Sequence, residues 1–443
     1  MRRGLSFALA SLAAAAMVLT GCTPDALRGG QSGAMSGQSQ DAPPSAPAAV
    51  SLPVELHAAG APEGLRIGVL VTLTSNPGQG VEWAGFAEGA RVAAERFAAG
   101  GTDVTLLSVD DRGTVEGAVA AVEDLAAKGV AGIVVASSGA HMDQALARAG
   151  ELKLPVLLPY DSDPARVQQA PQTTWLTGPD DTQYSKAFSA ALRSARVSGH
   201  VLLDVGGGSR YEPAPAETVQ LGVGADPLTV KDALAQAVEN TGAGAVVVSG
   251  PADDLARGVL AVQASGVQTP VFVTPEAISP RFADALVAQK ASPSQTLTSM
   301  GLLLSDSTAL VPGPQGEAMS AFLAGVRRSA QDPATVDLAA KDPFAQTAAA
   351  HAHPGAHDAV VALVRAAAKA KSAEPAKVAD ALRSLKLSHA DGIVTPGLSF
   401  TSSTGVPDAA LSTLFSTTQD VGLRPEVAKP DALSLQWFGE PTS

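Results

Sequence analysis

Short apolar runs alternate with amphipathic stretches along most of the chain from residue 65 onward. Runs such as 65–71 are apolar at nearly every position, which is typical of strands buried on both faces. Stretches such as 115–128 repeat Ala, Val and Leu at spacings of three and four, which predicts helices with one buried face. We expect strands at 65–71, 104–109, 131–136, 155–158, 201–205, 219–223, 245–248 and 271–273. We expect helices at 81–99, 115–128, 142–152, 230–241, 252–265, 315–330, 356–371 and 375–385.

This alternation of strand and helix predicts an α/β protein with parallel sheets covered on both faces. Two such series occur, and the roughly 380 residues that follow the N-terminal region exceed the usual size of one domain. The fold class expected is therefore two doubly wound, Rossmann-like lobes. Residues 331–354 are expected to be irregular, and 393–400 to be an extended, hairpin-like segment.

The N-terminus has the features of an export signal. Arg2 and Arg3 precede an apolar stretch of about 15 residues, shorter than the roughly 20 residues that span a membrane. It ends in Leu19-Thr-Gly-Cys22, which resembles the bacterial lipobox. The resemblance implies a signal peptide at 1–21 and a lipid anchor on Cys22, the only cysteine of the chain. A plain secretory signal or a twin-arginine signal are the alternatives.

Residues 22–62 are rich in Gly, Ser, Pro, Gln and Ala, which predicts a flexible tether. The net charge of −13 and the lack of a basic patch argue against nucleic-acid binding. No Gly-x-Ser-x-Gly or His-Glu-x-x-His pattern occurs, so we expect no enzyme and no cofactor. His351, His353 and His357 lie close in sequence, but Pro354 breaks any shared helical face, and we expect no metal site.

Several passages together resemble the branched-chain amino acid (Leu/Ile/Val)-binding proteins of the type I periplasmic-binding fold. They stand in the family's order, beginning with Arg66-Ile-Gly-Val-Leu and a helix that ends at Gly100-Gly101, and closing with His357-Asp-Ala-Val and Gly397-Leu-Ser-Phe-Thr. The resemblance implies a substrate-binding lipoprotein of an ABC importer. It also implies three hinge crossings, near 177–181, 303–305 and 400–403. The expected lobes are then 63–178 plus 306–400, and 179–305 plus 401–443.

Ligands of such sheets bind beyond the carboxyl ends of the strands. One such end carries Ser137, Ser138 and Gly139, whose hydroxyls and amides suit a ligand carboxylate, although a serine helix cap is the alternative.

The next strand end carries Tyr160, Asp161 and Ser162. The resemblance places Tyr160 and Ser162 on positions that bind the ligand's ammonium and carboxylate, and Asp161 would bind the ammonium if it points inward. A proline-bounded turn is the alternative.

The second lobe offers Ser249 and Glu276 at its strand ends. The resemblance assigns the ligand ammonium to Glu276, whereas a solvated loop glutamate is the alternative. Trp83 lies where the family's first loop covers the pocket, and it would contact the ligand side chain or pack in the core.

One region departs from the family. Residues 206–215 hold two prolines and are too few for the usual helix after strand 201–205, which indicates a trimmed second lobe. We expect a monomeric, membrane-anchored extracytoplasmic protein that captures a small polar ligand, an amino acid in the first instance, for an ABC permease. The alternative is a sensing or cell-envelope interaction protein with a degenerate pocket.

Overall fold

The structure is a computed structural model that describes residues 52–76, 78–206, 211, 213–425 and 435–439. The predicted signal peptide and Cys22 lie outside the described residues. Everything below concerns the unit that follows residue 49.

The first sheet has five parallel strands in the order β2-β1-β3-β4-β5. Four of them match the predicted apolar runs, and the three-residue β5 was not predicted. The strands are β1 (Leu65–Val71), β2 (Val104–Asp110), β3 (Ile133–Ala136), β4 (Val156–Leu158) and β5 (Thr174–Leu176).

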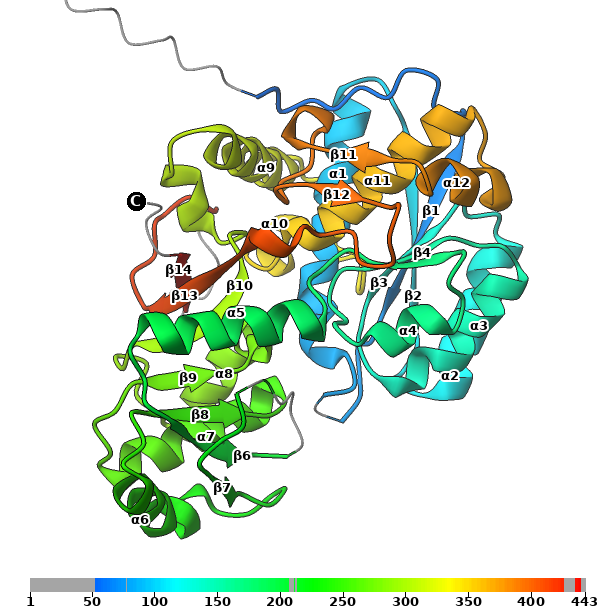
Figure 1. Ribbon diagram of the computed structural model, residues 1–443. Coiled ribbons are helices and arrows are strands. Elements are labelled where there is room, and N and C mark those ends of the chain that lie inside the picture. Colours follow the sequence, from blue (N-terminus) through cyan, green and yellow to red (C-terminus); the bar gives the residue numbers. More distant parts are fainter. Residues whose placement is uncertain (1–51, 77, 207–210, 212, 426–434, 440–443) are drawn as a thin grey trace, which may run out of the picture. The chain divides into compact units, whose positions relative to one another are not determined.

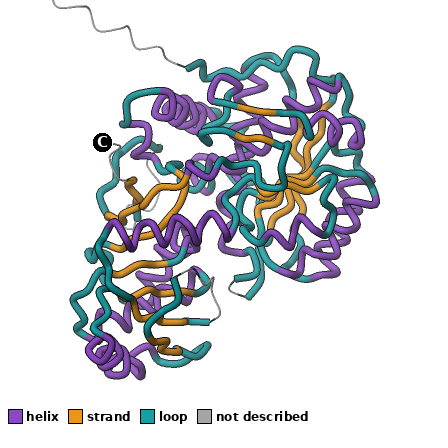
Figure 2. The backbone as a smooth tube through the Cα atoms, in the orientation of Figure 1, coloured by secondary structure: helices purple, strands orange, loops and turns teal. Residues whose placement is uncertain are grey.

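Helices cover both faces of this sheet, as Figures 1 and 2 show. Consecutive residues of β1 belong to different cores: Val69 packs with α1 and α11, and Leu70 packs with α2 and α3. The elements around this sheet are η1 (Val81–Glu88), α1 (Gly89–Ala99), α2 (Val115–Ala127), η2 (Ala140–Met142), α3 (Asp143–Glu151), α4 (Pro164–Gln168), α9 (Pro314–Gln331), α10 (Phe344–Thr347), α11 (Pro354–Ala370) and α12 (Pro375–Leu382). The predicted helix 81–99 is thus a 3₁₀ helix followed by an α-helix, and the predicted irregular segment 331–354 contains the short α10.

The second sheet has seven strands in the order β14-β13-β10-β9-β8-β6-β7. Its central strands are parallel, and β13 and β14 continue it in antiparallel fashion. The strands are β6 (His200–Asp204), β7 (Glu217–Gln220), β8 (Ala245–Ser249), β9 (Val271–Val273), β10 (Leu297–Leu302), β13 (Leu411–Thr417) and β14 (Gln436–Gly439). The elements around it are α5 (Asp181–Ser194), η3 (Pro227–Val230), α6 (Lys231–Thr241), α7 (Ala252–Ser265), η4 (Pro275–Ile278), α8 (Pro280–Gln289) and η5 (Asp306–Leu310).

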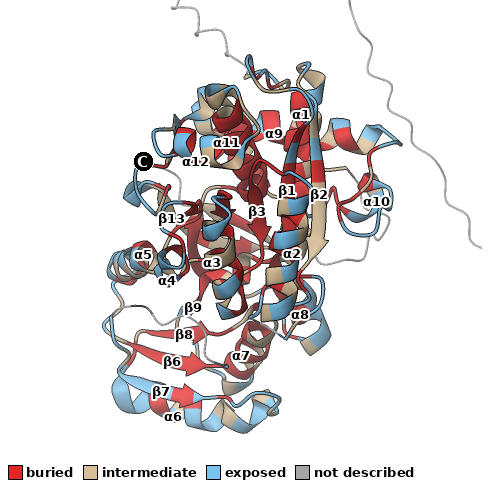
Figure 3. Ribbon diagram, turned by 90° about the vertical axis from the view of Figure 1, so that its right-hand side faces the viewer, coloured by how far each residue is buried: buried red, intermediate tan, exposed pale blue. Residues whose placement is uncertain are grey.

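The second lobe is buried on both faces near its centre and exposed at one edge (Figure 3). One core joins β8 and β9 to α7 and α8, and a second core lies under α5. The edge strand β7 has three exposed residues out of four. The described residues between β6 and the parallel β7 contain no helix, which fits the predicted trimming of this lobe.

The chain passes between the two sheets at three places. It leaves the first sheet after β5 to form α5, and it leaves the second sheet after β10 to form α9, which packs on α1. It returns after β12 (Leu398–Ser399), which pairs with β11 (Lys386–Leu387) in a two-stranded sheet. The short η6 (His389–Asp391) and η7 (Asp408–Ala410) lie in these connections.

The segment from residue 52 to residue 62 packs on the first lobe, although the predicted tether includes it. Leu56 and Ala58 are buried in the core of that lobe. The Arg96 guanidinium donates to the Val54 carbonyl (Nε to O, 2.7 Å), and Leu56 N donates to the Arg96 carbonyl (2.9 Å). Two apolar side chains and a buried arginine therefore hold a segment whose composition is otherwise that of a linker.

Candidate functional site

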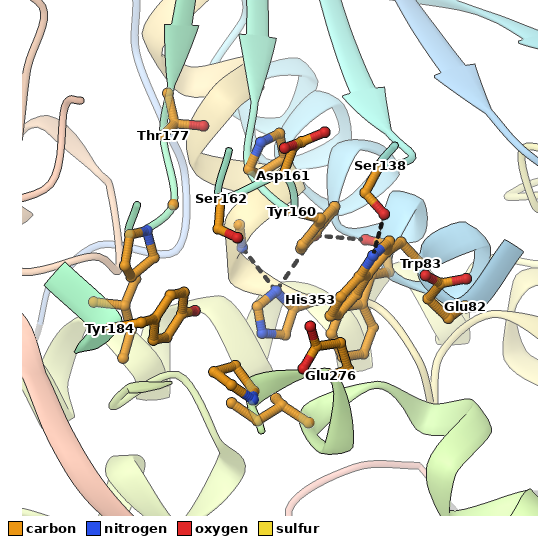
Figure 4. A pocket seen from close by; sticks show the side chains of 18 of the residues that line it. Glu82, Trp83, Ser138, Tyr160, Asp161, Ser162, Thr177, Tyr184, Glu276 and His353 are labelled. Carbon is orange, nitrogen blue, oxygen red and sulfur yellow. Dashed lines mark hydrogen bonds between the residues drawn. The ribbon is translucent and has the colours of Figure 1, made fainter. Parts of the chain in front are cut away.

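A cavity of about 400 Å³ lies at the carboxyl ends of strands from both sheets. That volume is within the range of pockets that enclose small ligands. Six of the predicted site residues line it, namely Trp83, Ser138, Tyr160, Asp161, Ser162 and Glu276. Figure 4 shows their side chains around one space, together with Glu82, Thr177, Tyr184 and His353. Whether the six bind a ligand remains a prediction.

Aromatic rings form one wall of the pocket. Trp83 of η1 stacks on Tyr160, which follows β4, with 5.4 Å between ring centroids and 8° between ring planes. Phe86 stacks on His353 at 4.1 Å. The Trp83 indole N–H donates to Ser138 Oγ (3.1 Å). These contacts fix the Trp83 ring at the edge of the cavity, so it is a pocket residue as well as a packing residue.

Tyr160 and His353 connect this wall to the start of α11. The Tyr160 hydroxyl accepts a hydrogen bond from Ala356 N (2.9 Å) and donates to the Phe86 carbonyl (3.3 Å). His353 caps α11 by accepting from Gly355 N at Nδ1 (3.1 Å). Burial, assisted by the positive charge of Arg424, lowers the pKa of His353 to about 3. The imidazole is therefore neutral at physiological pH and presents an uncharged ring to the pocket.

Asp161 lines the pocket, but its carboxylate oxygens already accept hydrogen bonds from other protein groups. Oδ2 accepts from Gly139 N (3.0 Å) and from Arg166 Nε (3.3 Å), and Oδ1 accepts from Asp163 N (2.9 Å). Desolvation raises the pKa of Asp161, while the two backbone donors and Arg166 act in the opposite direction. This carboxylate positions the turns after β3 and β4, and it is the weaker of the predicted ammonium partners.

Three predicted residues do not line the pocket. Ser137 is fully buried, with its Oγ 2.6 Å from Thr72 Oγ1. Gly139 adopts a positive φ of 113°, and its N–H is used by Asp161. Ser249 ends β8 and is 1% exposed, inside the second sheet. The turn after β3 therefore presents the second serine, not both, to the cavity.

The buried cluster around Ser137 contains a serine, a histidine and an aspartate without forming a catalytic triad. His141 Nε2 lies 3.1 Å from Asp111 Oδ2 and 3.4 Å from Ser137 Oγ. A relay requires the serine and the aspartate on opposite ring nitrogens. Both face the same nitrogen here, so the cluster is a structural network below the pocket.

Two acidic side chains enter the pocket beside Trp83. Glu276 is the second residue of η4, the short helix that follows β9 and Thr274. Glu82 lies on η1, is 4% exposed, and was not among the predicted ligand contacts. Desolvation raises the pKa of Glu82, and the negative charge of Glu276 acts in the same direction.

Hydroxyl groups complete the polar lining. Ser162 Oγ donates to Asp181 Oδ1 at the start of α5 (2.6 Å). Thr177 directly follows β5 and has a buried Oγ1 without a hydrogen-bond partner among the described residues. Sequence reasoning missed Thr177, Tyr184, Phe86 and His353. Thr177 could have been found by its position after a strand, had the short β5 been recognised.

The three clustered histidines have separate surroundings. His353 faces the pocket, while His357 is buried, with Nε2 2.8 Å from Arg96 Nη1 and Nδ1 2.8 Å from Asp358 Oδ1. His351 is exposed in the turn before α11 and lies next to Gly85. Within the described residues, no group of three metal-binding side chains occurs.

Two α/β lobes with a shared pocket at their strand ends define a solute-binding protein. Residues 64–412 match the profile of a family described as "Periplasmic binding protein", and the chain belongs to that family. It is a family of extracytoplasmic binding proteins rather than of enzymes. Nowhere in the described residues is there a helix long and apolar enough to cross a membrane.

Solved structures show the same fold, that of type I periplasmic binding proteins. One is the branched-chain amino acid transporter substrate binding protein LivJ from Streptococcus pneumoniae in complex with isoleucine (16% identity, 80% of this chain and 95% of that chain, TM-score 0.59). Another is a periplasmic binding protein type 1 from Bordetella pertussis (16%, 84% and 99%, 0.59). A third is a solute binding protein from R. palustris in complex with 4-hydroxybenzoate (13%, 85% and 98%, 0.56). The comparison with curated proteins found no match.

Proposed function

We propose that the protein captures a small amino compound, in the first instance an amino acid, outside the membrane and delivers it to an ABC permease. The observation that carries this proposal is the shared pocket, in which Glu276 of the second lobe lines the same cavity as Ser138 and Ser162 of the first. A carboxylate suits a ligand ammonium, and the Ser138 hydroxyl, whose oxygen accepts from Trp83, can donate to a ligand carboxylate. The solved structure with isoleucine supports this choice, and the one with 4-hydroxybenzoate indicates that the fold also accepts an aromatic acid.

In this proposal the three connections between the sheets act as a hinge, and closure of the lobes 63–178 plus 306–400 and 179–305 plus 401–443 encloses the ligand. The lipid on Cys22 would keep the protein near its permease. Detergent-phase partitioning tests the anchor: the wild type should enter the detergent phase, and Cys22→Ser should remain in the aqueous phase.

The sensing alternative is favoured by the missing helix between β6 and β7 among the described residues. The pocket argues against it, because a cavity of about 400 Å³ survives despite the trimming. Thermal unfolding with a panel of amino acids, amides and 4-hydroxybenzoate separates the two. One amino compound should raise the melting temperature by several degrees, whereas no shift across the panel would favour the sensing or interaction role.

Glu276→Gln tests the assignment of the ammonium site. The substitution removes the charge and keeps the size, so the affinity for the best amino acid should fall at least about tenfold, equal to ~1.4 kcal/mol. Isothermal titration measures it. Glu239→Gln on the exposed face of α6 is the matched control and should leave the affinity unchanged. An unchanged affinity in Glu276→Gln would remove this residue from the ligand site.

A further inference from the structure

Glu82 is fixed in the pocket by the segment that carries Glu276. Its backbone carbonyl accepts a hydrogen bond from Ser279 Oγ (2.8 Å), just after η4. Its side chain lines the cavity next to Trp83, whose ring stacks on Tyr160 (Figure 4). Glu82 therefore belongs to the first lobe and is joined directly to the second.

The carboxylate of Glu82 is buried without a full set of hydrogen bonds. The residue is 4% exposed, and its Oε2 atom has no hydrogen-bond partner in the described part of the chain. A buried carboxylate oxygen without a donor is costly, because it loses its hydration. Asp161 in the same pocket accepts from two backbone amides and from Arg166. The protein thus satisfies the Asp161 carboxylate and leaves an acceptor of the Glu82 carboxylate available.

The surroundings of Glu82 suit a cationic group. No lysine or arginine occurs among the described residues that line the cavity. Trp83, the next residue in the chain, lines the same cavity, and an indole ring attracts a cation by its ring electrons and covers an aliphatic stem. A hydroxyl could also donate to Oε2, but a basic nitrogen in addition restores the charge balance that burial of a carboxylate requires.

We propose that Glu82 determines ligand specificity and that the ligand carries a second basic nitrogen, as in a diamino acid, which donates to the Glu82 carboxylate. This inference rests on the proposed function, since it places the α-ammonium of the same ligand at Glu276. It goes beyond that function by naming the ligand class and a residue that sequence reasoning did not assign.

Two pairs of matched ligands test the proposal by isothermal titration. L-lysine and L-norleucine differ by the terminal ammonium, and L-arginine and L-citrulline differ by the charge of the terminal group. The wild type should bind the charged member of at least one pair about tenfold or more tightly than its neutral partner, as a charge-assisted hydrogen bond provides. In Glu82→Gln the ratio within that pair should fall to about one, while the neutral member keeps its wild-type affinity. That unchanged affinity also shows that the variant is folded.

The outcomes separate this inference from the function on which it rests. If norleucine and citrulline bind the wild type as tightly as lysine and arginine, the Glu82 inference is wrong and the amino-ligand function stands. The same holds if Glu82→Gln keeps the wild-type preference. If none of the four compounds, nor any other amino compound of the panel, binds the wild type, the proposed function fails and the inference fails with it.

Discussion

The two walls of the pocket hold their side chains in different ways. On the wall from the first sheet, Tyr160, Asp161 and Ser162 each hydrogen-bond to other protein groups. On the wall from the second sheet, Tyr184 of α5 is held by ring packing, with its centroid 6.0 Å from that of Tyr211. Hydrogen bonds within the protein therefore fix the side chains of the first wall without a ligand. We expect substitutions there to cost folding stability, and removal of the Tyr184 hydroxyl to affect mainly the ligand.

The most disruptive test of this difference is Arg166→Ala. Arg166 lies behind the first wall, with 10% of its side chain exposed, and pairs with Asp143, Asp161 and Asp163. Its removal leaves the buried Asp161 carboxylate without its cation, which should lower the free energy of unfolding by about 3–5 kcal/mol. Urea denaturation measures the loss.

Arg148→Ala is the control for that experiment. Arg148 also pairs with two acids, Glu123 and Glu151, but 38% of its side chain is exposed, so the solvent screens both interactions. It should change the stability little. Equal effects of the two substitutions would mean that the first wall is not held by its buried charges.

A second test concerns Glu88, which lies behind the first wall, and measures how the folding stability changes with pH. Glu88 ends η1, the helix that carries Trp83, and its Oε1 accepts from Leu338 N (2.9 Å). Desolvation raises the pKa of Glu88 from 4.5 to about 7. The folded protein therefore holds this proton more tightly than the unfolded chain. The resulting stabilisation is complete below about pH 4.5 and is lost as the pH rises through about 7.

Glu88→Gln removes this penalty and keeps an acceptor for Leu338 N. The variant should exceed the wild type in unfolding free energy by up to about 3 kcal/mol at pH 8, and the two should be equal near pH 4. Urea denaturation at both pH values checks this, with the exposed Glu239→Gln as the control. A difference that did not change with pH would exclude a titrating Glu88.

The sequence predicted less well the segment in which the chain crosses from the first sheet to the second, β5 and α5. Long apolar runs such as Leu65–Val71 identified the central strands, because burial on both faces leaves an unbroken pattern. The three residues Thr174–Leu176 of β5 are too few to show a pattern, and α5 mixes polar and apolar residues. Thr177, which directly follows β5, and Tyr184, which lies in α5, were therefore missed.

The sequence could predict where along the chain the pocket residues fall, but not which way their side chains point. The predicted strand ends place Tyr160 and Ser138 at the edge of the sheet where the cavity lies, since parallel strands end at the same edge. Which of two adjacent serines faces the pocket depends on how the chain leaves β3, where Ser137 turns toward Thr72 and Ser138 toward the cavity. His353 lies 193 positions from Tyr160, so only the folded chain brings them together.

The finest comparison of the walls uses two tyrosines, one from each. Tyr160→Phe removes the hydroxyl that accepts from Ala356 N and donates to the Phe86 carbonyl, and it leaves an amide of the first turn of α11 without its partner. We expect a loss of about 1–2 kcal/mol in unfolding free energy. Tyr184→Phe keeps the ring contact with Tyr211, so the loss should stay below about 0.5 kcal/mol. Urea denaturation of both variants measures the difference, and titration of the best ligand should show the second variant changed more in affinity than in stability. If Tyr184→Phe proved the more destabilising, the second wall would be as firmly built as the first, and the contrast between them would be lost.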